Sequence, residues 1–225
     1  MDSNVKREMK NLADQIENVS NQIEISLKSC ENLLANILFY SNYDFKVLKE
    51  VEFLRKKIFL SKLYLEKGKK AKGKKVFLMG GGIGVPPILE LAKQLDFADR
   101  QVIAGYRDKA TFLKEEFEAN GTLYISTEDG SVGTKGNVLD AVRENGLSAE
   151  IIYACGPTPM LRAVKQYAEE KHIECYISLE ERMACGIGAC LGCVCKTKEK
   201  DSHSNVNNKR ICKDGPVFAA AEVEL

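Results

Sequence analysis

The sequence predicts a mixed α/β protein in which a parallel β-sheet is preceded by a helical segment and followed by a cysteine-rich region. Three observations lead to this expectation. Apolar residues recur at helical spacing through residues 1–72, and short apolar runs then alternate with helical patterns as far as residue 178. Five of the eight cysteines follow residue 184. We therefore divide the chain into residues 1–72, 73–178 and 179–225.

Residues 1–72 predict a helical hairpin, or a long amphipathic helix that self-associates. Apolar positions are spaced by three or four, the period of one helix face, and turn residues at 41–44 separate two such stripes. The stripes are Leu12, Ile16, Val19, Ile23, Leu27, Cys30, Leu34 and Ile37, then Val47, Val51, Leu54, Ile58 and Leu65. Most stripes of this kind are packing surfaces, which is the simpler interpretation. Residues 67–75, rich in Lys and Gly, are expected to form a solvated linker.

Residues 73–178 show the alternation of strands and helices that is typical of a parallel sheet with helices on both faces. Val76–Met79 is a continuous apolar run, which suits a strand buried on both faces. Further strands are expected at residues 101–106, 122–127, 151–154 and 175–178. Helices are expected at residues 88–95, 109–119, 136–144 and 159–171.

Charge and hydropathy argue against two classes of partner. Lys and Arg number 33 against 32 Asp and Glu, a net charge of +1, whereas nucleic-acid binding usually requires a basic excess. No apolar run approaches the ~18 residues of a membrane span, and the first residues lack the apolar stretch of a secretion signal. We expect a cytoplasmic protein with no nucleic-acid or membrane partner. Its clustered cysteines then favour metal binding over disulfides.

The first strand of the sheet runs into a glycine-rich loop that suits a bound phosphate. Gly81, Gly82 and Gly84 leave backbone N–H groups open to an anion, and Pro86 suits the first turn of the following helix. The spacing Gly82-x-Gly84-x-Pro86 departs from the usual G-x-G-x-x-G dinucleotide pattern. Taken alone, the loop could therefore be an ordinary tight turn.

A second loop of the same kind follows the strand at residues 151–154. Cys155, Gly156 and Pro157 again lie between a strand and a helix. The carboxyl ends of neighbouring parallel strands meet at one edge of a sheet, so we expect both loops to face one crevice. Cys155 could line a nicotinamide pocket there, or it could simply be a small buried thiol.

The cysteine-rich region has the spacing of a plant-type [2Fe–2S] site. Cys185-x4-Cys190-x2-Cys193, with Cys212 at a distance, matches the C-x4-C-x2-C…C pattern. Three thiolates from one tight loop can wrap the cluster while a fourth completes the cage. A four-cysteine zinc site is the alternative, although three cysteines in one short loop of small residues look unlike two separate zinc knuckles.

A few further residues carry weaker signals. Cys195 is spare once four thiolates are assigned, and His203 lies in a polar stretch expected to be a surface loop. Tyr106 and Arg107 end a predicted strand and would lie near the adenosine half of a nucleotide, although Arg107 could equally be a surface charge. Residues 180–182 are charged and are expected to be solvated, or else to contact a flavin or partner.

From residue 75 onward the chain resembles the electron-transfer subunit of type B dihydroorotate dehydrogenase, in the ferredoxin reductase superfamily. The matching stretches, in the family's order, are Gly80–Pro87, Thr127–Gly136, Tyr153–Met160, Ser178–Cys193 and Cys212–Phe218. The resemblance implies that the first loop lies under the pyrophosphate of NAD and the second near its nicotinamide. It also implies that the cluster ligands are Cys185, Cys190, Cys193 and Cys212.

The same resemblance implies a role in pyrimidine biosynthesis. Members of the family pass electrons from the FMN of a catalytic dihydroorotate dehydrogenase subunit through [2Fe–2S] and FAD to NAD+. No catalytic acid or base is evident in this chain, which fits a protein that only conducts electrons. The alternatives are a subunit of a related NAD(P)H:ferredoxin-type oxidoreductase, and a non-redox binding module stabilised by a cluster or zinc.

One departure from the family concerns the flavin. The family begins with a β-barrel that grips FAD through an Arg-x-x-Ser-type segment, and residues 1–72 contain no such segment. FAD would then be held jointly with a partner, be borrowed from a partner's site, or be absent from a degraded relative. We expect the helical segment to replace the barrel with a docking element.

Overall fold

The computed structural model describes residues 69–225, except for Ile187 and residues 201–205. The helical stripes predicted before residue 69, together with Cys30 and His203, lie outside the described residues. Within the described part, the elements alternate between strand and helix as far as residue 178, as the sequence predicts.

A seven-stranded sheet organises the described chain, with the strand order β4-β3-β2-β1-β5-β6-β9. All neighbouring strands are parallel except β9, which runs antiparallel to β6. The strands are β1 (Lys75–Gly81), β2 (Asp99–Tyr106), β3 (Thr122–Thr127), β4 (Thr134–Lys135), β5 (Ile151–Cys155), β6 (Glu174–Ser178) and β9 (Val217–Ala219). The central strands are long apolar runs because both of their faces are covered.

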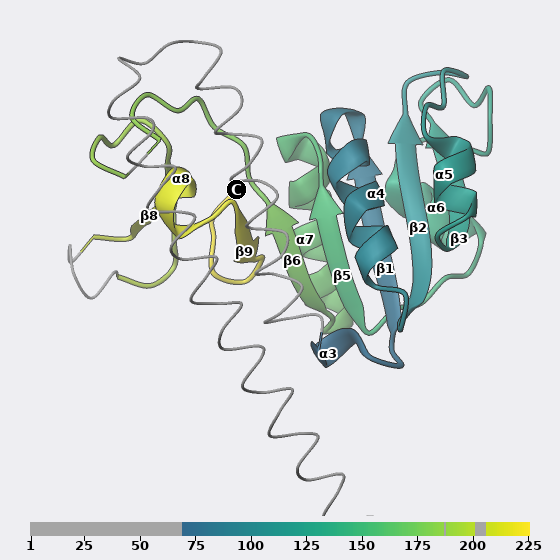
Figure 1. The fold of residues 1–225 in the computed structure, drawn as a ribbon, viewed down its shortest axis with the longest axis horizontal. Coiled ribbons are helices and arrows are strands. Elements are labelled where there is room, and N and C mark those ends of the chain that lie inside the picture. The colour runs from purple at the N-terminus through teal and green to yellow at the C-terminus, as the bar shows by residue number, and fades with distance from the viewer. Residues whose placement is uncertain (1–68, 187, 201–205) are drawn as a thin grey trace, which may run out of the picture. The chain divides into compact units, whose positions relative to one another are not determined.

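Helices cover both faces of this sheet (Figure 1). Helix α4 (Val85–Gln94) packs over β1, β2 and β5, and contacts α5 (Lys114–Glu118). Helices α6 (Val138–Glu144) and α7 (Thr158–Lys171) pack on the other face, α6 over β1 to β3 and α7 over β5 and β6. The expected fold class is confirmed: a mostly parallel sheet lies between two layers of helices.

The cysteine-rich region is built onto the β6 edge of the sheet. It contains β7 (Val194–Lys196), paired antiparallel with β8 (Asn208–Arg210), and the short helix α8 (Ile211–Asp214). Strand β9 follows α8 and pairs with β6, so that Ile177 lies opposite Phe218. The buried Cys193 and Ile211 belong to the same apolar core as these two residues. The core therefore continues without a break from the sheet into the cysteine-rich region.

Two sequence expectations need correction. The solvated linker expected before β1 is found only in part: Lys72, Gly73 and Lys75 are exposed, but Ala71 in the helical turn α3 (Lys69–Ala71) is fully buried, and the Gly73 N–H donates to the carbonyl of Phe97 at 3.1 Å. The helix expected at residues 109–119 is only α5. Leu113, with φ of 62°, adopts a left-handed conformation that keeps the preceding residues out of the helix.

Truncating the buried Phe218 should destabilise the protein because this ring joins the cysteine-rich region to the sheet. We expect Phe218→Ala to lower the free energy of unfolding by about 3–5 kcal/mol, measured by urea denaturation. Phe112→Ala is the matched control, since this ring is 48% exposed and packs edge-to-face on Tyr106. Its cost should be about 1 kcal/mol. Equal losses in the two variants would contradict the anchoring role of Phe218.

Candidate functional site

The order of the strands places both predicted nucleotide loops at one point of the sheet. After β1 the chain adds β2, β3 and β4 on one side of it, and then β5 and β6 on the other. Strands β1 and β5 are neighbours, with Gly80 paired opposite Cys155. Both loops therefore leave the carboxyl edge where the direction of winding reverses, which is where open α/β sheets bind their ligands.

The two loops touch through their backbones, and glycine makes this contact possible. A Cβ atom added to Gly84 would lie 2.0 Å from the carbonyl oxygen of Cys155, and one added to Gly156 would lie 3.0 Å from the carbonyl oxygen of Gly81. A Cβ atom on Gly81 would lie 2.6 Å from the Met160 sulfur. Any side chain at Gly84 would force the loops apart. These glycines fit close packing between loops as well as access for a phosphate.

Two helices begin at this edge with open N-termini. Helix α4 begins after the short 3-10 turn η2 (Gly82–Gly84), and α7 begins after Pro157. Neither helix has a side chain that caps its first N–H groups, and both carry proline in the first turn. In α4, however, Pro86 and Pro87 have no N–H and the Val85 N–H donates to the Gly82 carbonyl, so an anion there would be stabilised mainly by the helix dipole and by N–H groups of the preceding loop. The loops that hold Gly81, Gly82, Gly84 and Pro86 are therefore suited to a diphosphate.

Other residues near this edge have structural roles that the sequence did not show. The Tyr106 hydroxyl donates to the carbonyl of Phe112 at 2.7 Å, and burial raises the pKa of Tyr106 to about 12. Tyr106 thus fixes the loop after β2, whereas Arg107 is exposed. Cys155 is buried at the end of β5. Ile83 is 72% exposed in the first loop, and no sequence signal singled it out.

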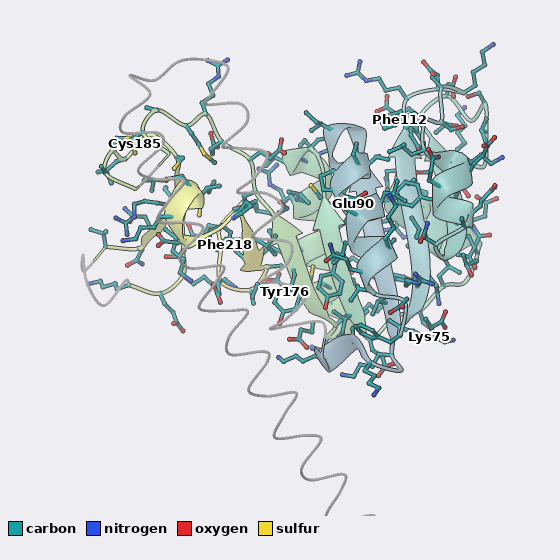
Figure 2. All side chains as sticks on the ribbon, viewed as in Figure 1. Lys75, Glu90, Phe112, Tyr176, Cys185 and Phe218 are labelled. Atoms are coloured by element: carbon teal, nitrogen blue, oxygen red, sulfur yellow. The ribbon has the colours of Figure 1, made fainter. Side chains whose placement is uncertain are left out.

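The cysteine site is formed by two segments that meet at the edge of the sheet. The loop carrying Cys185, Cys190 and Cys193 lies beside α8, which carries Cys212, and Figure 2 shows Cys185 there with Phe218 between this region and the sheet. The N–H of Ile211 donates to the carbonyl of Cys193 at 2.9 Å, which joins the two segments directly.

Backbone N–H groups point at the sulfur atoms of this site. The Cys190 N–H donates to Cys185 Sγ at 3.3 Å, and the Cys212 N–H donates to Cys193 Sγ at 3.4 Å. Burial and a hydrogen bond with Cys193 raise the pKa of Cys212 to about 12, and the backbone of Gly188 opposes part of this rise. N–H groups aimed at sulfur are the environment that thiolate ligands of an iron–sulfur cluster require.

In the part of the chain that the structure describes, the four predicted cysteine ligands are not gathered into one metal-binding group. Within the described ranges, no three His, Cys, Asp or Glu side chains form a group that could hold a metal ion as they stand. Cys193 is buried, and Cys185, Cys190 and Cys212 are half-buried. The donor set and its N–H groups fit a [2Fe–2S] cluster, and the ligand assignment stays a prediction.

Cys195 lies outside this arrangement, in agreement with its spare position in the sequence. Its thiol donates to the carbonyl of Lys209 at 3.5 Å between β7 and β8. Burial raises its pKa above the ordinary value. Cys175, on β6, is buried in the core and its pKa is raised by that burial to about 12. Cys195 thus bonds within the β7–β8 pair, and Cys175 packs in the core of the sheet.

Comparison with known proteins agrees with this architecture. Residues 180–224 match the family described as the iron-sulfur cluster binding domain of dihydroorotate dehydrogenase B. A solved structure of an NADH-dependent reduced ferredoxin-NADP oxidoreductase, studied for flavin-based electron bifurcation, aligns with a TM-score of 0.59 and 31% sequence identity. The alignment covers 67% of this chain and 54% of that one. The class is thus a reductase-like α/β domain joined to an iron–sulfur cluster binding domain.

Curated relatives narrow the class to one family. Dihydroorotate dehydrogenase B (NAD(+)) electron transfer subunits are 47% identical over 151 residues in Caldanaerobacter subterraneus and 49% identical over 158 residues in a Geobacillus species. The alignments cover 67% and 68% of this chain, but only 60% and 58% of those relatives. Along the residues that match, the chain belongs to the family of dihydroorotate dehydrogenase B electron transfer subunits. It spans about three-fifths of their length.

In the described part of the chain, no helix is both long enough and apolar enough to cross a membrane.

Adding a methyl group at the contact between the two loops should disturb both of them. We expect Gly84→Ala to lower the free energy of unfolding by about 1–3 kcal/mol and to weaken NADH binding, because its Cβ would overlap the Cys155 carbonyl. Gly192→Ala is the control, since its Cβ would come no closer than 3.5 Å to another residue's atoms. Urea denaturation and fluorescence titration with NADH measure the two effects. Full NADH affinity in Gly84→Ala would contradict the proposed loop contact.

Proposed function

We propose that this protein is an electron-transfer subunit that connects a [2Fe–2S] cluster to NAD+ in dihydroorotate oxidation, and hence in pyrimidine biosynthesis. One observation carries the proposal: the predicted cluster ligands are built onto the same sheet as the two nucleotide loops, through the pairing of β9 with β6. The cluster would be held by Cys185, Cys190, Cys193 and Cys212. The nucleotide would be held at the loops of β1 and β5.

Each part of the chain has a defined task in this proposal. The open N-termini of α4 and α7 bind the diphosphate, and the Cys155–Pro157 loop lies beside the nicotinamide. The N–H groups that point at Cys185 and Cys193 would stabilise negative charge on the cluster sulfurs. Among the described residues we identify no general acid or base for carbon chemistry, and in this proposal an FMN-containing catalytic partner oxidises dihydroorotate.

A flavin is the further requirement. NAD+ accepts two electrons together as a hydride, whereas a [2Fe–2S] cluster carries one electron at a time, and FAD supplies the conversion between the two when it is bound. The described residues include no separate barrel domain for FAD. We propose that FAD is held only when the partner subunit is bound.

A second candidate function involves the same cofactors but a different partner protein. The likeness to the ferredoxin-NADP oxidoreductase structure, at 31% identity and a TM-score of 0.59, favours a subunit of a related NAD(P)H:ferredoxin-type oxidoreductase. Copurification with a dihydroorotate-oxidising subunit, and NAD+ reduction that depends on dihydroorotate, would separate the two readings. A colourless protein that contains zinc would instead indicate a non-redox binding module.

Removing one predicted ligand should remove the cluster. We expect protein purified anaerobically to be red-brown, with iron and acid-labile sulfide in equal amounts, and Cys190→Ser to lose most of both. Cys195→Ser is the matched control from the same region, and it should keep its iron and sulfide because its thiol bonds to the Lys209 carbonyl. Unchanged iron in Cys190→Ser, or loss of iron in Cys195→Ser, would refute the ligand assignment.

Flavin content should depend on the partner. We expect the isolated chain to contain little FAD, and its complex with the catalytic subunit to contain FAD in addition to FMN. Both can be quantified by chromatography after denaturation. Stoichiometric FAD on the isolated chain would contradict this prediction, and the unchanged cluster content of the same sample would serve as the control.

A further inference from the structure

Gly188, in the middle of the cysteine loop, is held by Arg210. Its carbonyl accepts a hydrogen bond from Arg210 Nη1 at 3.1 Å. Gly188 has φ of 80°, and a Cβ atom there would lie 2.9 Å from the side chain of Lys213. Any side chain would be strained in this backbone conformation, so the position favours glycine.

Arg210 is itself fixed to the segment that carries Cys212. The Arg210 N–H donates to Asp214 Oδ2 at 2.7 Å, and its Nε lies 3.4 Å from the same oxygen. Asp214 ends the helix α8 that Cys212 belongs to. One guanidinium group therefore spans from α8 to the loop of Cys185, Cys190 and Cys193, the two segments that must come together around the cluster.

The positive charge of Arg210 also affects the reduction potential of a cluster bound here. Reduction adds one negative charge to a [2Fe–2S] cluster, and a nearby cation stabilises the reduced form and raises the reduction potential. The guanidinium bonds to the carbonyl of Gly188, which lies between the predicted ligands Cys185 and Cys190 in the cysteine loop, so its charge is close to those ligands. Its side chain is 30% exposed, so solvent screens this charge only in part.

We propose that Arg210 is a positioning residue of the iron–sulfur site: it clamps the cysteine loop onto α8 and raises the reduction potential of the cluster. This inference rests on the proposed function, because it requires that the cluster be present. A guanidinium is suited to both tasks, since its rigid fork can bond to a carbonyl and a carboxylate at once. An ammonium group would keep the charge but lose the second contact.

The test uses three variants of the full chain, each compared with the parent protein. Arg210→Gln removes both the positive charge and the hydrogen bond to Gly188, whereas Arg210→Lys keeps the charge. Lys209→Gln is the control: it removes a neighbouring positive charge that pairs with Glu222 at 2.8 Å. The measurements are the midpoint potential by anaerobic dye titration, the electron paramagnetic resonance spectrum of the reduced cluster, and the rate of bleaching by an iron chelator.

The expected pattern separates the clamp from the charge. Arg210→Gln should bleach roughly tenfold faster, with a more negative midpoint potential and an altered resonance spectrum. Arg210→Lys should bleach fast as well, yet retain most of the potential, and Lys209→Gln should match the parent in every measurement. A parent-like potential and bleaching rate in Arg210→Gln would overturn the inference while leaving the proposed function intact. A parent protein without a cluster would refute the proposed function first.

Discussion

The pairing of β9 with β6 is the constraint on which the functional arrangement depends. It adds an antiparallel strand to an otherwise parallel sheet, and it sets Phe218 of β9 opposite Ile177 of β6. The N–H of Leu179 donates to the carbonyl of Pro216 at 2.9 Å, and that of Ala220 donates to Cys175 at 2.8 Å, which extends the pairing at both ends. Arg162 on α7, whose Nε donates to the carbonyl of Leu225 at 3.2 Å, adds to this attachment.

Sequence reasoning succeeded for the sheet because burial leaves a clear pattern. The five strands expected from apolar runs are present, and β1 extends the run at Val76–Met79 by a residue or two at each end. The short strands β7, β8 and β9 were not predicted, since three-residue strands show neither periodicity nor a continuous apolar run. The predicted helix does not begin at residue 109 because the Asp108 carboxylate accepts a hydrogen bond from the Ala110 N–H, which favours a turn there.

Some of the functional residues could likewise be predicted from the sequence, and others could not. Spacing, together with the family resemblance, predicts the two nucleotide loops and the four cysteine ligands, because tight turns and metal sites impose fixed intervals between residues, and these assignments stay predictions. The direct contact of Gly84 with Cys155 and the clamp formed by Arg210 could not be predicted, because both join segments far apart in the chain. In the sequence, Arg210 followed four residues later by Asp214 resembles an ordinary ion pair on a helix surface.

The burial of Cys193 has a consequence for how the protein acquires its iron. Cys193 is 2% exposed and packs within the core that holds β6 and β9 together, whereas the other predicted ligands remain partly open to solvent. A donor that delivers iron and sulfide from outside would therefore meet Cys185, Cys190 and Cys212 first. Cluster insertion would be completed only when the inner thiol is reached, which makes the last step of maturation sensitive to local opening of the β6 edge.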